Sequence, residues 1–231
     1  MKWLLIETSG KTGQVALAMD DQILASTQLD QQQKHARDLA PATKHLFEKL
    51  QWQPKEVDAV AVSLGPGSYT GLRVGLISAK VFAFSTKCRL IGIPTFELLA
   101  WQGRALAADW QVIEDAQKSR FYHQQFHIPP ARLGPQAMTP MQVIDQAALL
   151  RMTAMDGQSA WLTGPAMHFI HDELPSQQRI APAALWHPQM PALLELALMR
   201  HAAGQFASPE SLEPLYYRPS SAEEQWKTMG R

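Results

Sequence analysis

The chain has 231 residues, of which 46% are hydrophobic and 18% are charged; this suits one large domain or two smaller lobes, and no apolar run predicts a membrane span. Lys and Arg number 21, as do Asp and Glu, and the resulting zero net charge argues against a stand-alone RNA-binding protein, which usually carries a basic face. The only cysteine, Cys88, excludes an internal disulfide framework and favours a cytoplasmic location.

The first 29 residues predict a three-stranded antiparallel meander, with strands at residues 2–7, 15–19 and 23–29. Apolar residues alternate along the second and third of these segments, which is the period of a half-buried strand. A helix with one apolar face is predicted at residues 35–50. The segment 57–63 is almost continuously apolar and contains three valines, which is typical of a strand buried on both faces.

A glycine-rich turn follows this strand and leads into a helix at residues 70–84. A short strand at 90–93 and a helix at 95–106 come next. A meander that continues into β-α units predicts a mixed sheet with helices on its faces.

The second half of the chain also begins with strands, which are expected at 110–115 and 121–128, and again at 161–163. Prolines at 129, 130, 135 and 140 indicate a loop-rich segment, and the structure of the rest of 129–190 is not predicted apart from the strand at 161–163. A helix at 191–203 begins with proline and is followed by glycine, the usual residues at those two positions.

The turn SLGPGSYTG, residues 63–71, resembles several ligand-binding loops but matches none of them. It lacks the lysine of a P-loop, the glycine spacing of a dinucleotide fingerprint and the flanking glycines of a nucleophile elbow. What remains is a strand, a turn and a helix N-terminus, whose free N–H groups could accept an anion. On these residues alone, a purely structural turn is the favoured interpretation.

Four small residues recur every four positions along the helix that follows: Gly71, Gly75, Ala79 and Ala83. Such a stripe lets another backbone approach closely. Each glycine in a helix costs about 1 kcal/mol relative to alanine, and this close packing is expected to offset that cost. The approaching backbone could belong to the protein's own sheet or to a helix of another chain. The pattern by itself favours neither.

Histidines raise the question of a metal site. His123 and His127 are four residues apart in a predicted strand, a separation of about 13 Å that is too long for one ion. We therefore expect exposed strand histidines and no metal. His168 and His171 lack a carboxylate partner in the sequence and are expected to face solvent.

The stretch VDAVAVSLGPGSYTGLRVGLISAKVFA, residues 57–83, closely resembles the signature of the TsaB family, also called YeaZ. Other segments resemble family landmarks in the same order, so that the resemblance runs from end to end of the chain and is weakest at 129–190. These segments are LLIETS, HARDLAP, IPTFELLA, EDAQKSRFY and LEPLYYR.

This resemblance implies an α/β protein with the two-lobed ASKHA fold of actin-like ATPases, in which each lobe has a mixed sheet flanked by helices. The first lobe would span residues 1–108 and the smaller second lobe 109–231, with helix 191–203 returning to the first. The family implies a non-catalytic partner of TsaD that works with TsaE and TsaC in modifying tRNA with threonylcarbamoyladenosine. ATP would be used by the complex, tRNA would be reached only through it, and no cofactor or metal is expected on this chain.

In the family, the helices corresponding to 35–50 and 70–84 form the association surface for the homodimer and for the pair with TsaD. The resemblance thus favours an interface over private packing for the small-residue stripe. A Gly75→Arg variant is expected to lose pairing while remaining folded. The expected interface residues are His35, Leu39, Gly71, Leu72, Gly75, Leu76, Ala79, Lys80 and Ala83.

Glu7 stands where the family usually has Asp, at the position where a carboxylate helps to hold metal and phosphate in catalytic ASKHA enzymes. No catalytic residue is assigned on this basis. The alternative function is a small ASKHA phosphotransferase or ATPase. Its candidate anion or nucleotide contacts are Glu7, Thr8, Ser9, Gly65, Gly67, Ser68 and Thr70.

Overall fold

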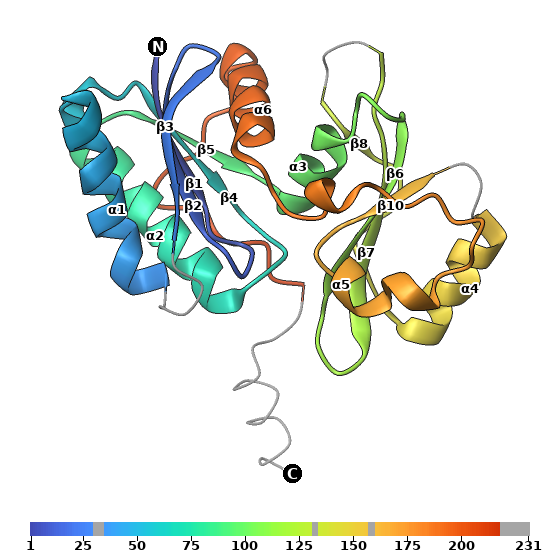
Figure 1. The fold of residues 1–231 in the computed structure, drawn as a ribbon. Helices are drawn as coiled ribbons and strands as arrows, with labels where there is room; N and C mark the ends of the chain where they lie inside the picture. The colour runs from blue at the N-terminus through green and yellow to red at the C-terminus, as the bar shows by residue number, and fades with distance from the viewer. Residues whose placement is uncertain (30–34, 131–133, 157–159, 218–231) are drawn as a thin grey trace.

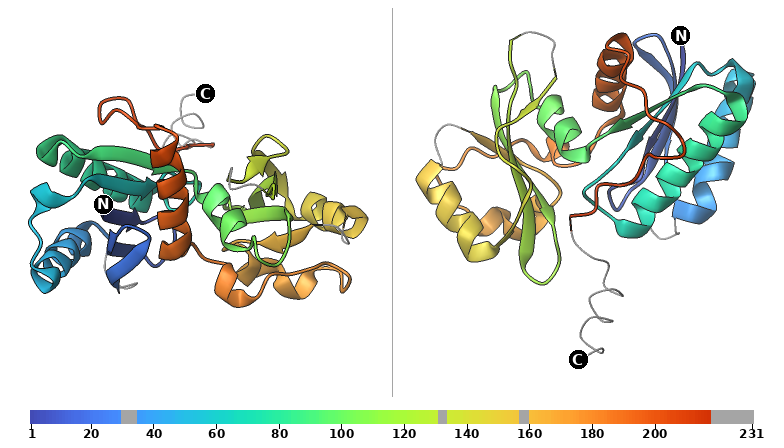
Figure 2. Two further views of the ribbon diagram at one scale, coloured as in Figure 1. Left: turned by 90° about the horizontal axis from the view of Figure 1, so that it is seen from above. Right: turned by 180° about the vertical axis from the view of Figure 1, so that it is seen from behind.

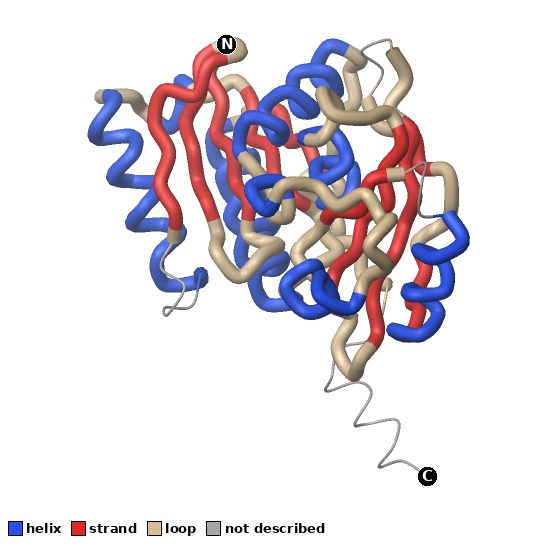
Figure 3. The backbone as a smooth tube through the Cα atoms, turned by 45° about the vertical axis from the view of Figure 1, so that its right-hand side comes forward, coloured by secondary structure: helices blue, strands red, loops and turns tan. Residues whose placement is uncertain are grey.

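The computed structural model describes residues 1–29, 35–130, 134–156 and 160–217. They form two lobes that lie side by side, each built on a mixed five-stranded sheet with helices on its faces (Figure 1). This confirms the predicted fold class. Figure 3 shows the strands of both sheets in red with the helices in blue around them.

The first sheet has the strand order β3-β2-β1-β4-β5. β1 pairs antiparallel with β2, and β2 with β3, which is the predicted meander, while β4 and β5 run parallel to β1. β1 and β4 are buried on both faces along nearly their whole length, in keeping with their continuous apolar sequence. The strand bounds are β1 Lys2–Glu7, β2 Gln14–Met19, β3 Gln22–Gln28, β4 Ala59–Ser63 and β5 Arg89–Ile93.

Helices cover both faces of this sheet (Figures 1 and 2). α1 (His35–Leu50) and α2 (Tyr69–Thr86) pack on one face, and α6 (Met190–Ala202) packs on the other. α3 (Thr95–Gln102) lies between α6 and the second sheet and ends four residues earlier than predicted. It stops at Gly103, where a Cβ atom would lie 2.1 Å from the indole ring of Trp110.

The second sheet has the order β10-β6-β7-β8, with β9 also paired to β7. α4 and α5 pack on its outer side, whereas α3 packs on its inner side. β8 lies in the segment that was expected to be loop-rich, and no structure had been predicted for the residues of β9 and α4. The bounds are β6 Asp109–Asp115, β7 Arg120–His127, β8 Gln136–Ala137, β9 Gln142–Asp145, α4 Gln146–Asp156, β10 Trp161–Thr163 and α5 Met167–Ile170, with short 3₁₀ turns η1 Pro54–Glu56, η2 His171–Glu173 and η3 Ala183–Leu185.

One apolar core joins the two lobes. It runs from the α6 side of the first sheet, at Trp3 and Leu5, through α3 and α6 to Trp110 and Phe126 of the second sheet. Arg200 of α6 adds a polar tie, because its Nη2 atom lies 2.6 Å from Oε2 of Glu97 on α3. α6 therefore packs against the first sheet although it follows the second lobe in sequence.

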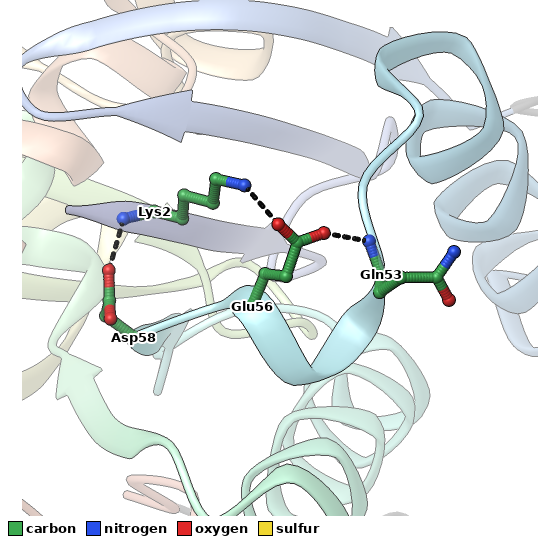
Figure 4. Close-up of polar contacts among 4 residues, drawn as sticks. All are labelled: Lys2, Gln53, Glu56 and Asp58. Carbon is green, nitrogen blue, oxygen red and sulfur yellow. Dashed lines mark hydrogen bonds and ion pairs between the residues drawn. The ribbon is translucent and has the colours of Figure 1, made fainter.

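A polar cluster fixes the start of β1 against the loop before β4 (Figure 4). The backbone N–H of Lys2 donates to Asp58 at 2.6 Å, and its ammonium group donates to Glu56 at 2.7 Å. Glu56 also accepts the N–H of Gln53 at 2.5 Å. The Gln53 bond, followed by Lys2, holds the pKa of the Glu56 carboxyl below its ordinary value. The four residues support the parallel register of β1 and β4.

Membrane crossing needs a long and continuously apolar helix. None of the helices in the described ranges combines the required length and apolarity.

Candidate functional site

A cleft of about 1200 Å³ lies between the lobes, at the end of the first sheet where β1 and β4 finish. The β1–β2 turn, the glycine turn and the start of α2 line it from the first lobe. From the second lobe come the β6–β7 hairpin, α5 and the segment before α6. The last described residues, including Tyr216 and Tyr217, also line it. Sequence segments far apart in the chain therefore meet in one hollow.

Glu7 ends β1 beside this cleft, but its side chain is buried, with 1% exposed. Its Oε1 atom accepts the backbone N–H of Ser9 at 2.7 Å, the hydroxyl of Ser9 and the hydroxyl of Ser63 at 3.1 Å. The carboxylate therefore serves to join β1 to β4.

Several N–H groups of the glycine turn form hydrogen bonds within the protein. The N–H of Ser68 donates to the carbonyl of Ser9 at 2.7 Å, and that of Gly65 donates to the Thr95 hydroxyl at 3.0 Å. The Ser68 hydroxyl caps α2 by accepting the N–H of Gly71 at 3.2 Å. A Cβ atom on Gly67 would lie 2.3 Å from the Ser9 carbonyl oxygen, so only glycine fits there. These contacts favour the structural interpretation of the turn.

The predicted anion contacts fall into two groups. Thr8 is fully buried and packs under α2, away from the cleft. Ser9, Gly67, Ser68 and Thr70 do line the cleft. A role for them in binding an anion stays a prediction.

Glu114, near the end of β6, is a cleft residue that the sequence interpretation did not single out. Desolvation raises the pKa of its carboxyl to about 8, with smaller raising effects from the charges of Asp115 and Glu7. The N–H of Asp115 opposes this by donating to the carboxyl at 2.8 Å. Glu114 is therefore mostly protonated at neutral pH. In the sequence, the only signal for a cleft position of Glu114 is that it lies near the end of a predicted strand, as Glu7 does.

The C-terminal segment 212–217 lies along α2 and over the glycine turn. The N–H of Leu215 donates to the Leu64 carbonyl at 2.8 Å, and the Lys80 ammonium donates to the Leu212 carbonyl at 3.1 Å. Arg73 donates from Nε to the Tyr216 hydroxyl at 3.0 Å. This segment, which holds the first six residues of the family-like LEPLYYR motif, thus belongs to the wall of the cleft.

The small-residue stripe of α2 faces the protein's own sheet, which corrects the predicted interface. Gly75 lies over the end of β1, where a Cβ atom would be 2.1 Å from Oγ1 of Thr8 and 3.4 Å from Ile6. The stripe is inaccessible to another chain because the sheet already covers it. The predicted interface residues buried in this way are Leu39, Gly71, Leu72, Gly75, Leu76, Ala79 and Ala83.

Two predicted interface residues remain. Lys80 is partly exposed at the edge of α2 and bonded to Leu212. The side chain of His35 lies outside the described residues.

The opposite face of α2 carries an exposed apolar row of Ile77, Val81 and Phe84, each 60–62% exposed. We call these three residues the outer row. α1 packs beside α2 through a stack of Phe47 and Phe82 with ring centroids 6.0 Å apart. Large apolar side chains left exposed on one helix face indicate an interaction surface.

The strand histidines differ from the prediction. His123 is fully buried. Its burial is possible because Gln111, which is also buried on the neighbouring strand β6, offers a hydrogen-bond partner, with Oε1 at 3.2 Å from Nε2 of His123. His127 pairs with Asp109 at 2.7 Å. His168 is exposed, as expected, but contacts His187. Within the described ranges, no group of three or more His, Cys, Asp or Glu side chains could hold a metal ion.

Comparisons with known proteins agree with this architecture. A family model described as "TsaD: tRNA N6-adenosine threonylcarbamoyltransferase" matches residues 22–226. The tRNA threonylcarbamoyladenosine biosynthesis protein TsaB of Bacillus subtilis is 28% identical over 230 residues, 98% of each chain. The protein of the same name from Escherichia coli is 23% identical over 234 residues, covering 99% of this chain and 98% of the other.

Among solved structures, a Pseudomonas aeruginosa protein described as similar to peptidase YEAZ superposes with a TM-score of 0.79. The two are 20% identical, and the match covers 94% of this chain and 99% of the other, so it bears on the fold alone. Two lobes with mixed sheets, an antiparallel meander and β-α units make up the ASKHA fold. The chain belongs to the family that the TsaD model describes, and within it to the TsaB (YeaZ) proteins.

Proposed function

We propose that this chain is a non-catalytic partner subunit in the biosynthesis of threonylcarbamoyladenosine on tRNA, and that it scaffolds a TsaD-type catalytic subunit. The pathway is supported by relatives that are named for it and match over nearly the full length of both chains. The near-full-length match to a TsaD model supports a shared fold with the catalytic partner.

The observation that carries the partner role is the outer row of α2. Ile77, Val81 and Phe84 are one helix turn apart and more than half exposed. Apolar area of this kind contributes to association when a partner removes it from water. We assign it to the TsaD-type subunit, and to a second copy of this chain when the catalytic subunit is absent.

The non-catalytic part of the proposal rests on Glu7 and the glycine turn. Ser9 and Ser63 donate to the Glu7 carboxylate, and the N–H groups of Gly65 and Ser68 in the glycine turn bond within the protein. ATP use therefore falls to the complex, in which a TsaE-type protein is a further partner and tRNA is bound jointly. We assign this role to the cytoplasm, where the lone Cys88 stays reduced.

The test is threonylcarbamoylation of tRNA by purified TsaC, TsaD and TsaE with and without this chain. We expect modification only when the chain is present, and no ATP hydrolysis by the chain alone. An Ile77→Asp variant should fail to support modification, whereas Met138→Asp, equally exposed but on the second lobe, should support it fully. Modification that proceeds unchanged without the chain would contradict the scaffold role.

A further inference from the structure

A pair of histidines lies on the second-lobe side of the cleft. His168, on α5, and His187, in the segment before α6, have their Nε2 atoms 2.7 Å apart. The ring planes are tilted by only 27° and the centroids are 4.9 Å apart. The contact is a hydrogen bond between ring nitrogens, in which one ring donates and the other must be unprotonated to accept. A second proton on the pair breaks this bond.

The first lobe presents Lys11 to this pair. The Lys11 ammonium lies 5.4 Å from the centroid of the Phe169 ring, and Phe169 directly follows His168. Gln14, from the same hairpin, donates to the carbonyl of Pro188 at 3.2 Å, and Pro188 directly follows His187. The β1–β2 hairpin therefore approaches both histidine-bearing segments, with a positive charge at its tip.

The cleft also contains Asp115, whose Oδ1 atom accepts the N–H of Gln117 at 2.7 Å. Burial lowers the pKa of His187, and the charges of His168 and Lys11 lower it further. Glu114 on β6 is close enough to Lys11 for that positive charge to lower its pKa slightly, but the pKa is still about 8, so Glu114 is mostly neutral at pH 7. His171, which also contacts Trp186, is bonded to Asp172 at 2.7 Å. In the described part of the chain, neither Lys11, His168 nor His187 forms an ion pair.

We propose that Lys11, His168 and His187 form a binding site for a doubly charged tetrahedral oxyanion, such as the phosphate group of a small ligand, and that binding takes up a proton. Lys11 and the two imidazoles line the same cleft, which is open to a ligand, and an anion bound between them would favour the doubly protonated form of the pair. Protonation of the pair releases both Nε2–H groups as donors, which form charge-assisted bonds to the anion. The site needs no partner protein, so it stands or falls separately from the scaffold role.

The sign of the linkage follows from the lowered pKa. In the free protein His187 is neutral at pH 7, whereas a bound anion favours its charged form and raises its pKa. Affinity for the anion therefore increases as pH falls from 8 toward 6. It levels off once His187 is protonated in the free protein as well.

Sulfate is the suitable first probe because it stays doubly charged over this pH range, whereas a phosphate monoester has a second pKa of about 6 and changes charge within it. We expect calorimetry on the isolated chain to show sulfate binding about tenfold tighter at pH 6 than at pH 8. Repeating the titration in two buffers with different ionisation enthalpies should show net proton uptake at pH 7. No binding at pH 6, or binding without pH dependence or proton uptake, would overturn the proposal.

Variants separate the three groups from their surroundings. His187→Gln should weaken sulfate binding at pH 6 about tenfold and remove the proton uptake, while Lys11→Gln should weaken binding but leave an uptake. His171→Gln is the matched control, since it also contacts Trp186 but is bonded to Asp172. Equal losses in the control and in His187→Gln would refute the assignment, and circular dichroism confirms that each variant is folded.

The same titration with inorganic phosphate and with glycerol phosphate distinguishes a free anion from a phosphate monoester. Tighter binding of glycerol phosphate identifies the ester as the ligand class, and tighter binding of inorganic phosphate identifies the free anion. Failure of both, with sulfate also unbound, rejects the site.

Discussion

The two faces of α2 carry opposite kinds of side chain. The inner face has glycine and alanine, and Gly75 there is so close to β1 that a Cβ atom would meet Thr8. The outer face has Ile77, Val81 and Phe84, all exposed. Small residues let this helix pack closely on its own sheet, and the large apolar residues of the other face stay exposed. Residue size along a helix thus indicates close approach but not which backbone approaches.

The largest effect is expected when the inner face is broken. Gly75→Arg would insert a long charged side chain between α2 and β1, where Thr8 and Ile6 leave no room. Overpacking together with an unpaired buried charge should cost about 4 kcal/mol or more, which is enough to unfold many domains. Urea denaturation measures this free energy directly. The earlier expectation that this variant stays folded is therefore replaced by the opposite one.

Ile77→Arg is the matched control, because it introduces the same side chain two positions away on the outer face. Its free energy of unfolding should stay within about 0.5 kcal/mol of the unchanged protein. If Gly75→Arg unfolded at the same urea concentration as Ile77→Arg, the contrast between the faces would be wrong.

Breaking the outer face should affect pairing instead of folding. Ile77→Asp or Phe84→Asp should weaken binding to a TsaD-type subunit by about 2–4 kcal/mol, roughly 30- to 1000-fold, because a charge would enter an apolar contact. Titration calorimetry with the purified catalytic subunit gives this number. Met138→Asp, which is equally exposed on the second lobe, should bind normally. Normal binding by both outer-row variants would remove the docking surface from α2.

A pH titration sharpens the contrast, because the outer row has no titratable group while the cleft beside the start of α2 contains Glu114. Its pKa is raised from 4.5 to about 8. A raised pKa means that stability is full below pH 4.5 and is lost as pH rises toward 8, since the unfolded carboxyl ionises first. We expect the free energy of unfolding to fall by about 2 kcal/mol between pH 5 and pH 8. This is less than the full pKa shift implies, because the carboxyl is partly exposed and solvent screens it.

Glu114→Gln should remove this loss, and urea denaturation at pH 5 and pH 8 measures it as a difference between variant and unchanged protein. The affinity of pairing through the outer row should not show the same dependence on pH as the free energy of unfolding. A variant whose stability falls with pH as steeply as that of the unchanged protein would show that Glu114 is not the responsible group.

The sequence allowed much of this fold to be predicted, for reasons that are local. Alternation along β2 and β3 and the continuous apolar run in β4 report burial directly. The orientation of α2 could not be predicted, because Gly75 and Ala79 at four-residue spacing fit a sheet and a partner helix equally well. The family resemblance pointed to the small-residue face of α2, which the protein's own sheet covers; whether a partner docks on this helix stays a prediction.

The second lobe was harder because its signals depend on tertiary contacts. The burial of His123 depends on Gln111, twelve residues away on the neighbouring strand, and the raised pKa of Glu114 depends on desolvation where the two lobes meet. The contact between His168 and His187 joins two segments 19 residues apart. None of these pairings has a period or a spacing that a single sequence reveals.

The smallest effect concerns the edge between the two faces of α2, where Arg73 and Lys80 hold the C-terminal segment. Tyr216→Phe removes only the hydroxyl that accepts from Arg73, and the exposed position limits its contribution to about 0.5–1 kcal/mol. Global unfolding should barely change. The local opening of the segment should increase about two- to fivefold, seen as faster hydrogen exchange at the Leu215 N–H, which bonds to the Leu64 carbonyl. Unchanged exchange there would mean that the Leu215 bond and the Tyr69–Tyr216 ring contact hold the segment without the hydroxyl. Faster exchange on the inner face of α2 as well would mean that the segment supports the helix itself and not only the wall of the cleft.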